Sequence, residues 1–223
     1  MNRSGVARWR LVCLISLGVF LGLGLAVYAT GALPGDMFLL RELAAWDGGL
    51  TSELARSVNH AGRAQVLVPA TILLFWLSPA ARRRWWLWCA VLSGAPLLQN
   101  VLKFFVGRPR PNGLSFGFPS GDVTAATAFA LVLIYLASRE RLGRGPRLAI
   151  AALAACLMLA VGWARIMRHA HWPSDVLGGF LLGICCAAAA AWWVSSRPEA
   201  APERRSVGEP DEQGLGIATT SRS

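Results

Sequence analysis

The sequence predicts an all-α, polytopic membrane protein with six transmembrane helices, and its composition already favours that class. Hydrophobic residues make up 55% of the 223 residues, charged residues make up only 15%, and the mean hydropathy is +0.47. A soluble domain of this length carries more charge. The formal net charge is +10. The basic residues fall in short clusters between apolar runs, which is typical of membrane-protein loops and not of a nucleic-acid-binding surface.

Six apolar runs come close to the length of about 20 residues that a membrane-spanning helix needs. The second and fourth runs are short or interrupted by polar residues and Pro69. Tryptophans at the start of the third run and at the end of the sixth indicate the lipid–water interface. The runs are Leu11–Leu33, Ala61–Pro79, Trp85–Val106, Val123–Ser138, Leu148–Ala164 and Val176–Val194.

The two ends of the chain differ in character. The first run has the basic start and small-residue end of a signal peptide, but it is longer than the usual apolar core, so we expect an uncleaved helix. From Ser195 onward the composition turns to Arg, Glu, Pro, Gly and Ser, which indicates disorder. We therefore predict one six-helix domain over residues 1–195 and a disordered cytoplasmic tail over residues 196–223.

The distribution of basic residues predicts the orientation. With the N-terminus in the cytoplasm, 14 of the 22 basic residues fall in cytoplasmic segments, as the positive-inside rule requires. Basic residues also crowd, against that rule, into or beside two short outer loops, and these are Lys103, Arg108, Arg110, Arg165 and Arg168. Some of them, Arg108 and Arg168 in particular, could simply face lipid headgroups. The others indicate an anionic ligand at the outer face.

Two motifs between the third and fourth runs offer groups that bind phosphate. In "KFFVGRPRP", Lys103 is followed after six residues by Arg110, and both cations match phosphate oxygens. In "FGFPSGD", Ser120, Gly121 and Asp122 lead directly into the fourth run. A helix that starts there presents unpaired backbone N–H groups and the positive end of its dipole to an anion.

The third motif, "ARIMRHAHWPSD", combines a cation with a candidate nucleophile. Arg165 adds bidentate donors for phosphate, and His171 follows it by six positions. Asp175, four residues after His171, is placed to fix the tautomer of the imidazole, although it could also be merely a helix cap. Attack by His171 on phosphorus would give a phosphohistidine that water then hydrolyses.

These motifs, in this order and between these apolar runs, resemble those of the type 2 phosphatidic acid phosphatase superfamily of lipid phosphate phosphatases. The resemblance covers about residues 60–195, and it implies six helices with catalytic loops that face outward. It also implies that His171 is the nucleophile and Asp175 its partner. The residues that it implies for phosphate binding are Lys103, Arg110, Ser120, Gly121 and Arg165.

Two positions depart from the family pattern. Ala164 replaces a serine, which removes one hydrogen bond. Asp122 stands where the family usually has the histidine that protonates the leaving group. A carboxyl group beside a phosphate dianion can still hold and deliver a proton, so we expect Asp122 to serve as the general acid. The alternatives are that Asp122 only caps a helix, that His169 donates the proton, or that catalysis is weakened.

The resemblance implies metal-independent hydrolysis of a phosphomonoester or pyrophosphate on a membrane lipid, at the periplasmic face of a bacterial inner membrane. The candidate substrates are undecaprenyl diphosphate, phosphatidylglycerol phosphate, phosphatidate and a lipid A phosphate. The acidic Asp122 favours a specialised substrate such as lipid A or an isoprenoid carrier. A lipid phosphotransferase and a catalytically weak lipid-phosphate-binding protein remain as alternatives. The sequence does not predict the oligomeric state.

No metal or other cofactor is expected. The five cysteines lie inside apolar runs without metal-ligand spacing, which indicates small packing residues. A metal site built from His169, His171 and Asp175 is disfavoured, because the nearby arginines would repel a cation. The region Pro34–His60 mixes apolar and charged residues, so we expect it to lie in the membrane interface as a lid that contributes to specificity.

Overall fold

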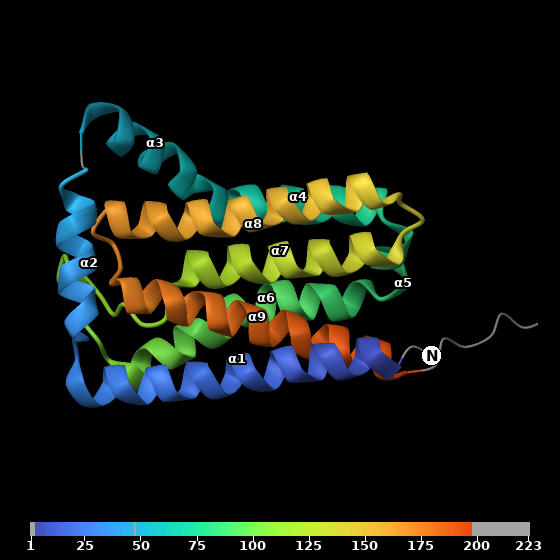
Figure 1. Ribbon diagram of the computed structural model, residues 1–223, viewed down its shortest axis with the longest axis horizontal. Helices are drawn as coiled ribbons and strands as arrows, with labels where there is room; N and C mark the ends of the chain where they lie inside the picture. Colours follow the sequence, from blue (N-terminus) through green and yellow to red (C-terminus); the bar gives the residue numbers. More distant parts are fainter. Residues whose placement is uncertain (1–2, 47, 198–223) are drawn as a thin grey trace, which may run out of the picture.

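The computed structural model describes residues 3–46 and 48–197, which form a bundle of long helices (Figure 1). Among these residues, five helices are long and apolar enough to cross a membrane. The predicted all-α, multi-pass membrane architecture is therefore confirmed. The predicted tail lies outside the described residues from position 198 onward. The five spans are α1 (Arg3–Thr30), α6 (Trp85–Val106), α7 (Gly121–Arg139), α8 (Arg144–Met167) and α9 (Pro173–Ser196).

The second predicted span, Ala61–Pro79, is shorter than expected. It forms α4, Ala64–Leu77, whose 14 residues extend about 21 Å at about 1.5 Å per residue, whereas a bilayer core is about 30 Å thick. The helix ends at Ser78, whose hydroxyl accepts a hydrogen bond from the Ala81 N–H and so caps a separate short helix, α5 (Pro79–Arg83).

Helix α7 occupies the centre of the bundle and packs against α6, α8 and α9 (Figure 1). Helix α1 packs along α9 on the outside. Since α6 and α8 run toward the same end of the bundle and α7 and α9 run back from it, the α6–α7 and α8–α9 loops meet at that end. The three sequence motifs are thereby brought to one end, as predicted.

Small residues set the distance between α7 and α9. A Cβ atom on Gly179 would lie 2.8 Å from the Ser120 carbonyl oxygen, and one on Gly183 would lie 2.7 Å from the Thr124 carbonyl oxygen. The two backbones therefore approach so closely that only glycine fits, which is the usual device for tight helix packing in membranes. This contact fixes the first half of α9 against the start of α7.

The segment between α1 and α4 forms two short helices at the same end of the bundle. Helix α2 (Pro34–Ala44) lies across the ends of the spans, and α3 (Gly49–Asn59) packs beside α8, followed by the turn η1 (His60–Gly62) (Figure 1). Exposed apolar side chains on both helices, including Phe38 and Leu50, suit a position in the membrane interface.

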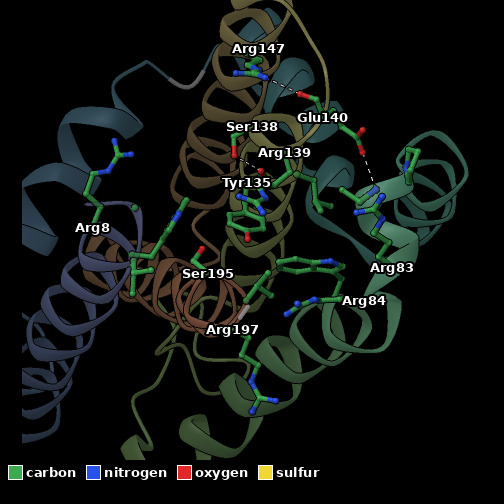
Figure 2. Close-up of a pocket in the computed structure, with 18 of the residues that line it drawn as sticks. Arg8, Arg83, Arg84, Tyr135, Ser138, Arg139, Glu140, Arg147, Ser195 and Arg197 are labelled. Atoms are coloured by element: carbon green, nitrogen blue, oxygen red, sulfur yellow. Dashed lines mark hydrogen bonds between the residues drawn. The ribbon is translucent and has the colours of Figure 1, made fainter. Parts of the chain in front are cut away.

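The end of the bundle opposite α2 contains a cavity. It lies among the N-terminal part of α1, α5, the start of α6, the ends of α7 and α9 and the start of α8 (Figure 2). None of the three motifs contributes to its lining.

The orientation can be tested with two matched leucine-to-cysteine substitutions at opposite ends of the bundle. Leu114 in the α6–α7 loop is 83% exposed, and Leu142 before α8 is 37% exposed. With the native cysteines replaced first, we expect Leu114→Cys in intact spheroplasts to react with a membrane-impermeant thiol reagent and Leu142→Cys to react only after lysis. The reverse pattern would place the motif end of the bundle in the cytoplasm.

Candidate active site

A cavity of about 640 Å³ lies between α4, α6, α7 and α8, and its polar part is at the α2 end of the bundle. Residues from all three motifs line it, although they come from three different helix ends and two loops. The structure therefore brings together most of the residues predicted from the sequence. Those that line the cavity are Lys103, Arg110, Gly121, Asp122, Arg165 and His171.

His171 is buried and paired with Asp175 on the first turn of α9. The Nδ1 atom of His171 lies 3.4 Å from Asp175 Oδ2, and the two side chains are 1% and 0% exposed. Burial lowers the pKa of His171 to about 4, and the hydrogen bond to Asp175 opposes this shift only in part. The imidazole is therefore neutral at pH 7, and Nε2 is the ring nitrogen that remains for a ligand in the cavity.

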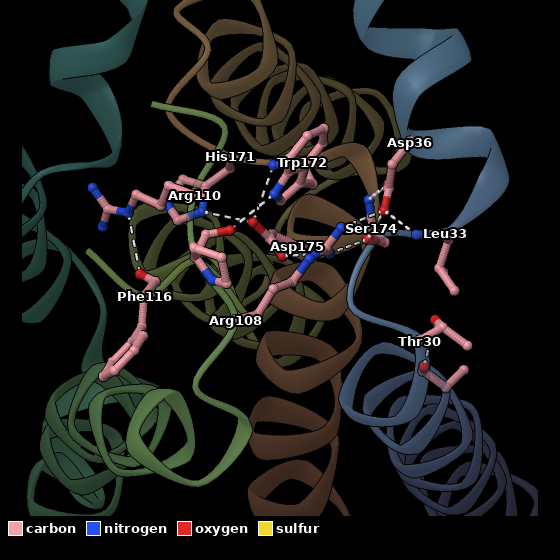
Figure 3. Close-up of polar contacts among 12 residues, drawn as sticks. Thr30, Leu33, Asp36, Arg108, Arg110, Phe116, His171, Trp172, Ser174 and Asp175 are labelled. Atoms are coloured by element: carbon pink, nitrogen blue, oxygen red, sulfur yellow. Dashed lines mark hydrogen bonds and ion pairs between the residues drawn. The ribbon is translucent and has the colours of Figure 1, made fainter. Parts of the chain in front are cut away.

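Asp175 is held in place by two further hydrogen bonds (Figure 3). Its Oδ2 accepts from the Trp172 N–H at 3.0 Å, which caps α9. Its Oδ1 accepts from Arg108 Nη1 at 2.9 Å. Asp175 is thus both a helix cap and the partner of His171, so the two sequence-based interpretations of this residue are compatible.

Arg108 belongs to this buried network, although the sequence did not indicate such a position for it. The interpretation that it faces lipid headgroups is wrong, because its side chain is only 2% exposed and bridges two carboxylates. Its Nη2 donates to Asp36 at 2.6 Å, and its Nη1 donates to both Asp175 and the Ser174 hydroxyl (Figure 3). Arg168, in contrast, is exposed.

Asp36 ties α2 to this network. Its carboxylate accepts from the Ser174 N–H at 2.8 Å and from the Ser174 hydroxyl at 2.7 Å, in addition to Arg108. Burial alone would raise the pKa of Asp36, but the hydrogen bonds from Ser174 and Arg108 outweigh it and hold the pKa below its ordinary value. One signal in the sequence was an acidic residue in the otherwise apolar stretch "LPGDMFLL". No local spacing connects it to Arg108.

Arg165 is shared between the candidate site and α3. Its Nη1 lies 2.9 Å from Asp122 Oδ2 and donates to Asn59 Oδ1 at 2.7 Å. Its Nε is buried without a hydrogen-bond partner among the described residues. The guanidinium of Arg165 is therefore already paired with Asp122 at the cavity wall.

At the start of α7, Gly121 and Asp122 line the cavity and Ser120 does not. Ser120 is the N-cap residue, yet its hydroxyl makes no capping bond and is buried without a partner among the described residues. It does not line the cavity, so its role in phosphate binding stays a prediction. Gly121 does line the cavity, and a Cβ atom there would lie 2.9 Å from the Gln99 side chain. Asp122 pairs with Arg165 and does not occupy the N-cap position.

The remaining sequence-based expectations concern residues away from the cavity wall. His169, in the α8–α9 loop, is not among the lining residues. Neither are the described residues of α2 and α3, so the lid role of Pro34–His60 stays a prediction. Among the described residues, no group of three or more His, Cys, Asp or Glu side chains could hold a metal ion. Metal independence is likewise still a prediction.

Comparison with known proteins gives consistent results. Residues 84–199, which contain all three motifs, match the sequence model of the PAP2 superfamily. The chain is 25% identical over 174 residues to phosphatidylglycerophosphatase B of Bacillus subtilis, which is 74% of this chain and 86% of that protein. It is 35% identical over 111 residues to lipid A 1-phosphatase of Rhizobium etli, a match that covers 42% of each chain.

Two solved structures have the same fold. The crystal structure of a transmembrane PAP2-type phosphatidylglycerolphosphate phosphatase from Bacillus subtilis has a TM-score of 0.76 at 22% identity, and it covers 85% of this chain and 98% of that one. The crystal structure of Aquifex aeolicus LpxE has a TM-score of 0.59 at 25% identity and covers 72% and 97%. The sequence match, the shared fold and the convergence of the three motifs lead to one conclusion: this multi-pass membrane chain belongs to the PAP2 superfamily.

Proposed function

We propose that the chain hydrolyses a phosphomonoester or pyrophosphate on a membrane lipid through a phosphohistidine on His171, without a metal ion. The coarser assignment, a lipid phosphate phosphatase, follows from its superfamily and from relatives that are named as lipid phosphatases. One observation supports the proposed mechanism. His171, Asp122 and three cationic side chains lie together at one end of a cavity that is otherwise largely apolar.

The shape of the cavity suits an amphiphile. Beyond its charged end, α4 and α6 supply apolar walls down to Phe75 and Leu92. Along α4, the lining residues extend from Ala64 to Phe75, which is about 16 Å at about 1.5 Å per residue. Val68 and Ile72, which also line it, are 54% and 65% exposed on the bundle surface. A lipid chain can therefore lie in this groove while its phosphate reaches the cations.

In the first step, Nε2 of His171 attacks phosphorus and the bond from phosphorus to the leaving oxygen breaks. Asp175 keeps the Nδ1 proton in place and stabilises the positive charge that develops on the ring. Lys103, Arg110 and Arg165 stabilise the charge on the non-bridging oxygens. Asp122, which lines the same cavity, gives its proton to the leaving oxygen.

In the second step, water attacks phosphorus, the Nε2–phosphorus bond breaks, and inorganic phosphate leaves. Asp122, now a carboxylate, accepts the proton from that water, because the acid of the first step becomes the base of the second. Binding of a phosphate to Arg165 would engage the guanidinium that pairs with Asp122.

Relatives suggest which substrates to test first. The Bacillus subtilis relative that aligns over most of this chain is named for phosphatidylglycerol phosphate, and the Rhizobium etli relative is named for the 1-phosphate of lipid A. We place phosphatidylglycerol phosphate first because that match extends over 86% of the relative. Undecaprenyl diphosphate and phosphatidate complete the panel. The reaction takes place at the periplasmic face of a bacterial inner membrane, where the positive-inside rule orients the motif end.

Arg108 is a positioning residue in this mechanism. It does not line the cavity, but it fixes Asp175 and thus the orientation of His171. Its buried guanidinium also forms an ion pair with each of the two carboxylates that it bridges.

A comparison of two histidine substitutions tests the nucleophile. His171→Ala should abolish phosphate release from the four lipids in detergent, whereas His169→Ala, two residues away, should retain most of it. Both measurements include EDTA, so activity of the wild type under these conditions also tests metal independence. Loss of activity in His169→Ala with retention in His171→Ala would contradict the assignment. Transfer of phosphate to a second lipid instead of water would support the transferase.

Substitution of Arg108 tests the positioning role. Arg108→Gln leaves two buried carboxylates without their cation, which should lower stability by roughly 3–5 kcal/mol. We expect kcat to fall while KM changes little, because Arg108 does not touch the cavity. Arg108→Lys keeps the charge but not the forked geometry and should be intermediate. Arg168→Gln is the matched control, since Arg168 is exposed. Wild-type melting and turnover in Arg108→Gln would contradict the role.

The general acid can be tested with two leaving groups. Asp122→Asn should slow cleavage of a lipid alkoxide by roughly 10²–10⁴-fold and affect an activated aryl phosphate little, because only the alkoxide needs a proton in order to leave. Asp122→His, which restores the usual family residue, should keep appreciable activity. Equal slowing of both substrates by Asp122→Asn would show that this residue acts only through its ion pair with Arg165.

A further inference from the structure

The cavity at the end opposite the candidate active site has a volume of about 1300 Å³. This is larger than a typical small-molecule pocket of about 300–1,000 Å³. Arginines from α1, α5, α7, α8 and the end of α9 surround it, together with the carboxylate of Glu140 (Figure 2). The lining arginines are Arg8, Arg83, Arg84, Arg139, Arg141, Arg147 and Arg197.

Glu140 supplies only one negative charge against the seven lining arginines, so it cannot balance them. One carboxylate oxygen accepts from the Ser78 hydroxyl at 2.5 Å and from the Ala80 N–H at 3.0 Å. These two hydrogen bonds, the Ser78 bond foremost, hold the pKa of Glu140 below its ordinary value. The cavity therefore retains a strong excess of positive charge.

Three buried donors in the cavity wall lack partners among the described residues. They are the Trp88 indole N–H, the Tyr135 hydroxyl and the Nη1 group of Arg84. Trp88 and Tyr135 are only 1% and 3% exposed. Buried polar atoms in native proteins nearly always have a hydrogen-bond partner, so three orphaned donors at one cavity indicate a ligand.

A role in membrane topology alone does not account for this arrangement. The positive-inside rule requires a number of basic residues near the ends of the spans, and exposed arginines such as Arg144, the first residue of α8, satisfy it. It does not require a guanidinium to be stacked on a ring and aimed at a cavity. Arg84 lies 5.6 Å from the Trp193 ring centroid, and Arg197 lies 3.9 Å from the same ring.

We propose that this cavity binds a phosphate-bearing anion, presented either by a phospholipid headgroup of the adjacent leaflet or by free phosphate. Arg84, Trp88 and Tyr135 would donate to the phosphate oxygens, and charge-assisted bonds of this kind are the strong ones. The apolar lining residues Val6 and Val194 provide a wall against which a lipid glycerol or chain can lie. Basic pockets between transmembrane helices at the cytoplasmic side commonly hold anionic headgroups. This inference does not depend on the proposed function.

Binding to the full-length protein in a neutral detergent tests the proposal. The probes are dioleoylphosphatidylglycerol, cardiolipin, zwitterionic dioleoylphosphatidylcholine and inorganic phosphate at matched ionic strength, with lipid adducts counted by native mass spectrometry and melting temperature measured in parallel. Saturable binding of the anionic lipids, at least about tenfold tighter than phosphatidylcholine, identifies the headgroup as the source. Saturable stabilisation by inorganic phosphate alone, with no lipid preference, identifies the free anion.

Variants assign the binding to this cavity. The double substitution Arg84→Gln and Arg139→Gln should weaken binding by at least about tenfold. Tyr135→Phe removes one orphaned hydroxyl; it should weaken binding without lowering the melting temperature of the ligand-free protein, since none of the described residues bonds that hydroxyl. Arg144→Gln removes one positive charge at the same end outside the cavity and should bind normally. Binding that is unaffected by the cavity variants, or reduced equally by Arg144→Gln, would overturn the proposal.

Discussion

The fold and the candidate site both depend on the position of Arg108. Its guanidinium is buried between Asp36 on α2 and Asp175 on α9, and it also bonds the Ser174 hydroxyl. A charge buried this deeply is tolerated only when its partners are fixed around it, so the contact constrains three separate parts of the chain at once. Helix α2 is thereby held across the end of the bundle, and the first turn of α9 is held against the loop that follows α6.

This constraint accounts for the state of His171. Because Arg108 bonds Oδ1 of Asp175 and the Trp172 N–H bonds Oδ2, the carboxylate is held with Oδ2 facing Nδ1 of the imidazole. Burial keeps the ring neutral at pH 7, with a pKa of about 4. A neutral imidazole with its far nitrogen open to a cationic cavity is suited to attack a phosphate, and the apolar groove beyond it is suited to hold the rest of a lipid.

The sequence was sufficient for features that depend on local pattern and insufficient for those that depend on distant contacts. Apolar runs predicted the long spans, and the four-residue spacing of His171 and Asp175 predicted their pairing. The role of Arg108 could not be predicted, because its partner Asp36 is 72 positions away and neither residue belongs to a periodic pattern. The second apolar run predicted α4 but overestimated its length, because hydropathy alone does not show that Ser78 ends one helix and caps the next.

We propose that Nε2 of His171 carries the phosphoryl group during turnover. The most direct measurement is rapid quenching of the full-length enzyme with its lipid phosphate into alkaline denaturant, where phosphohistidine survives, followed by peptide mass spectrometry and phosphorus NMR of the labelled ring. Since Asp175 occupies the Nδ1 side, we expect phosphate on Nε2 of His171 alone. Phosphate on Nδ1, on another residue, or on no residue while turnover proceeds would contradict it.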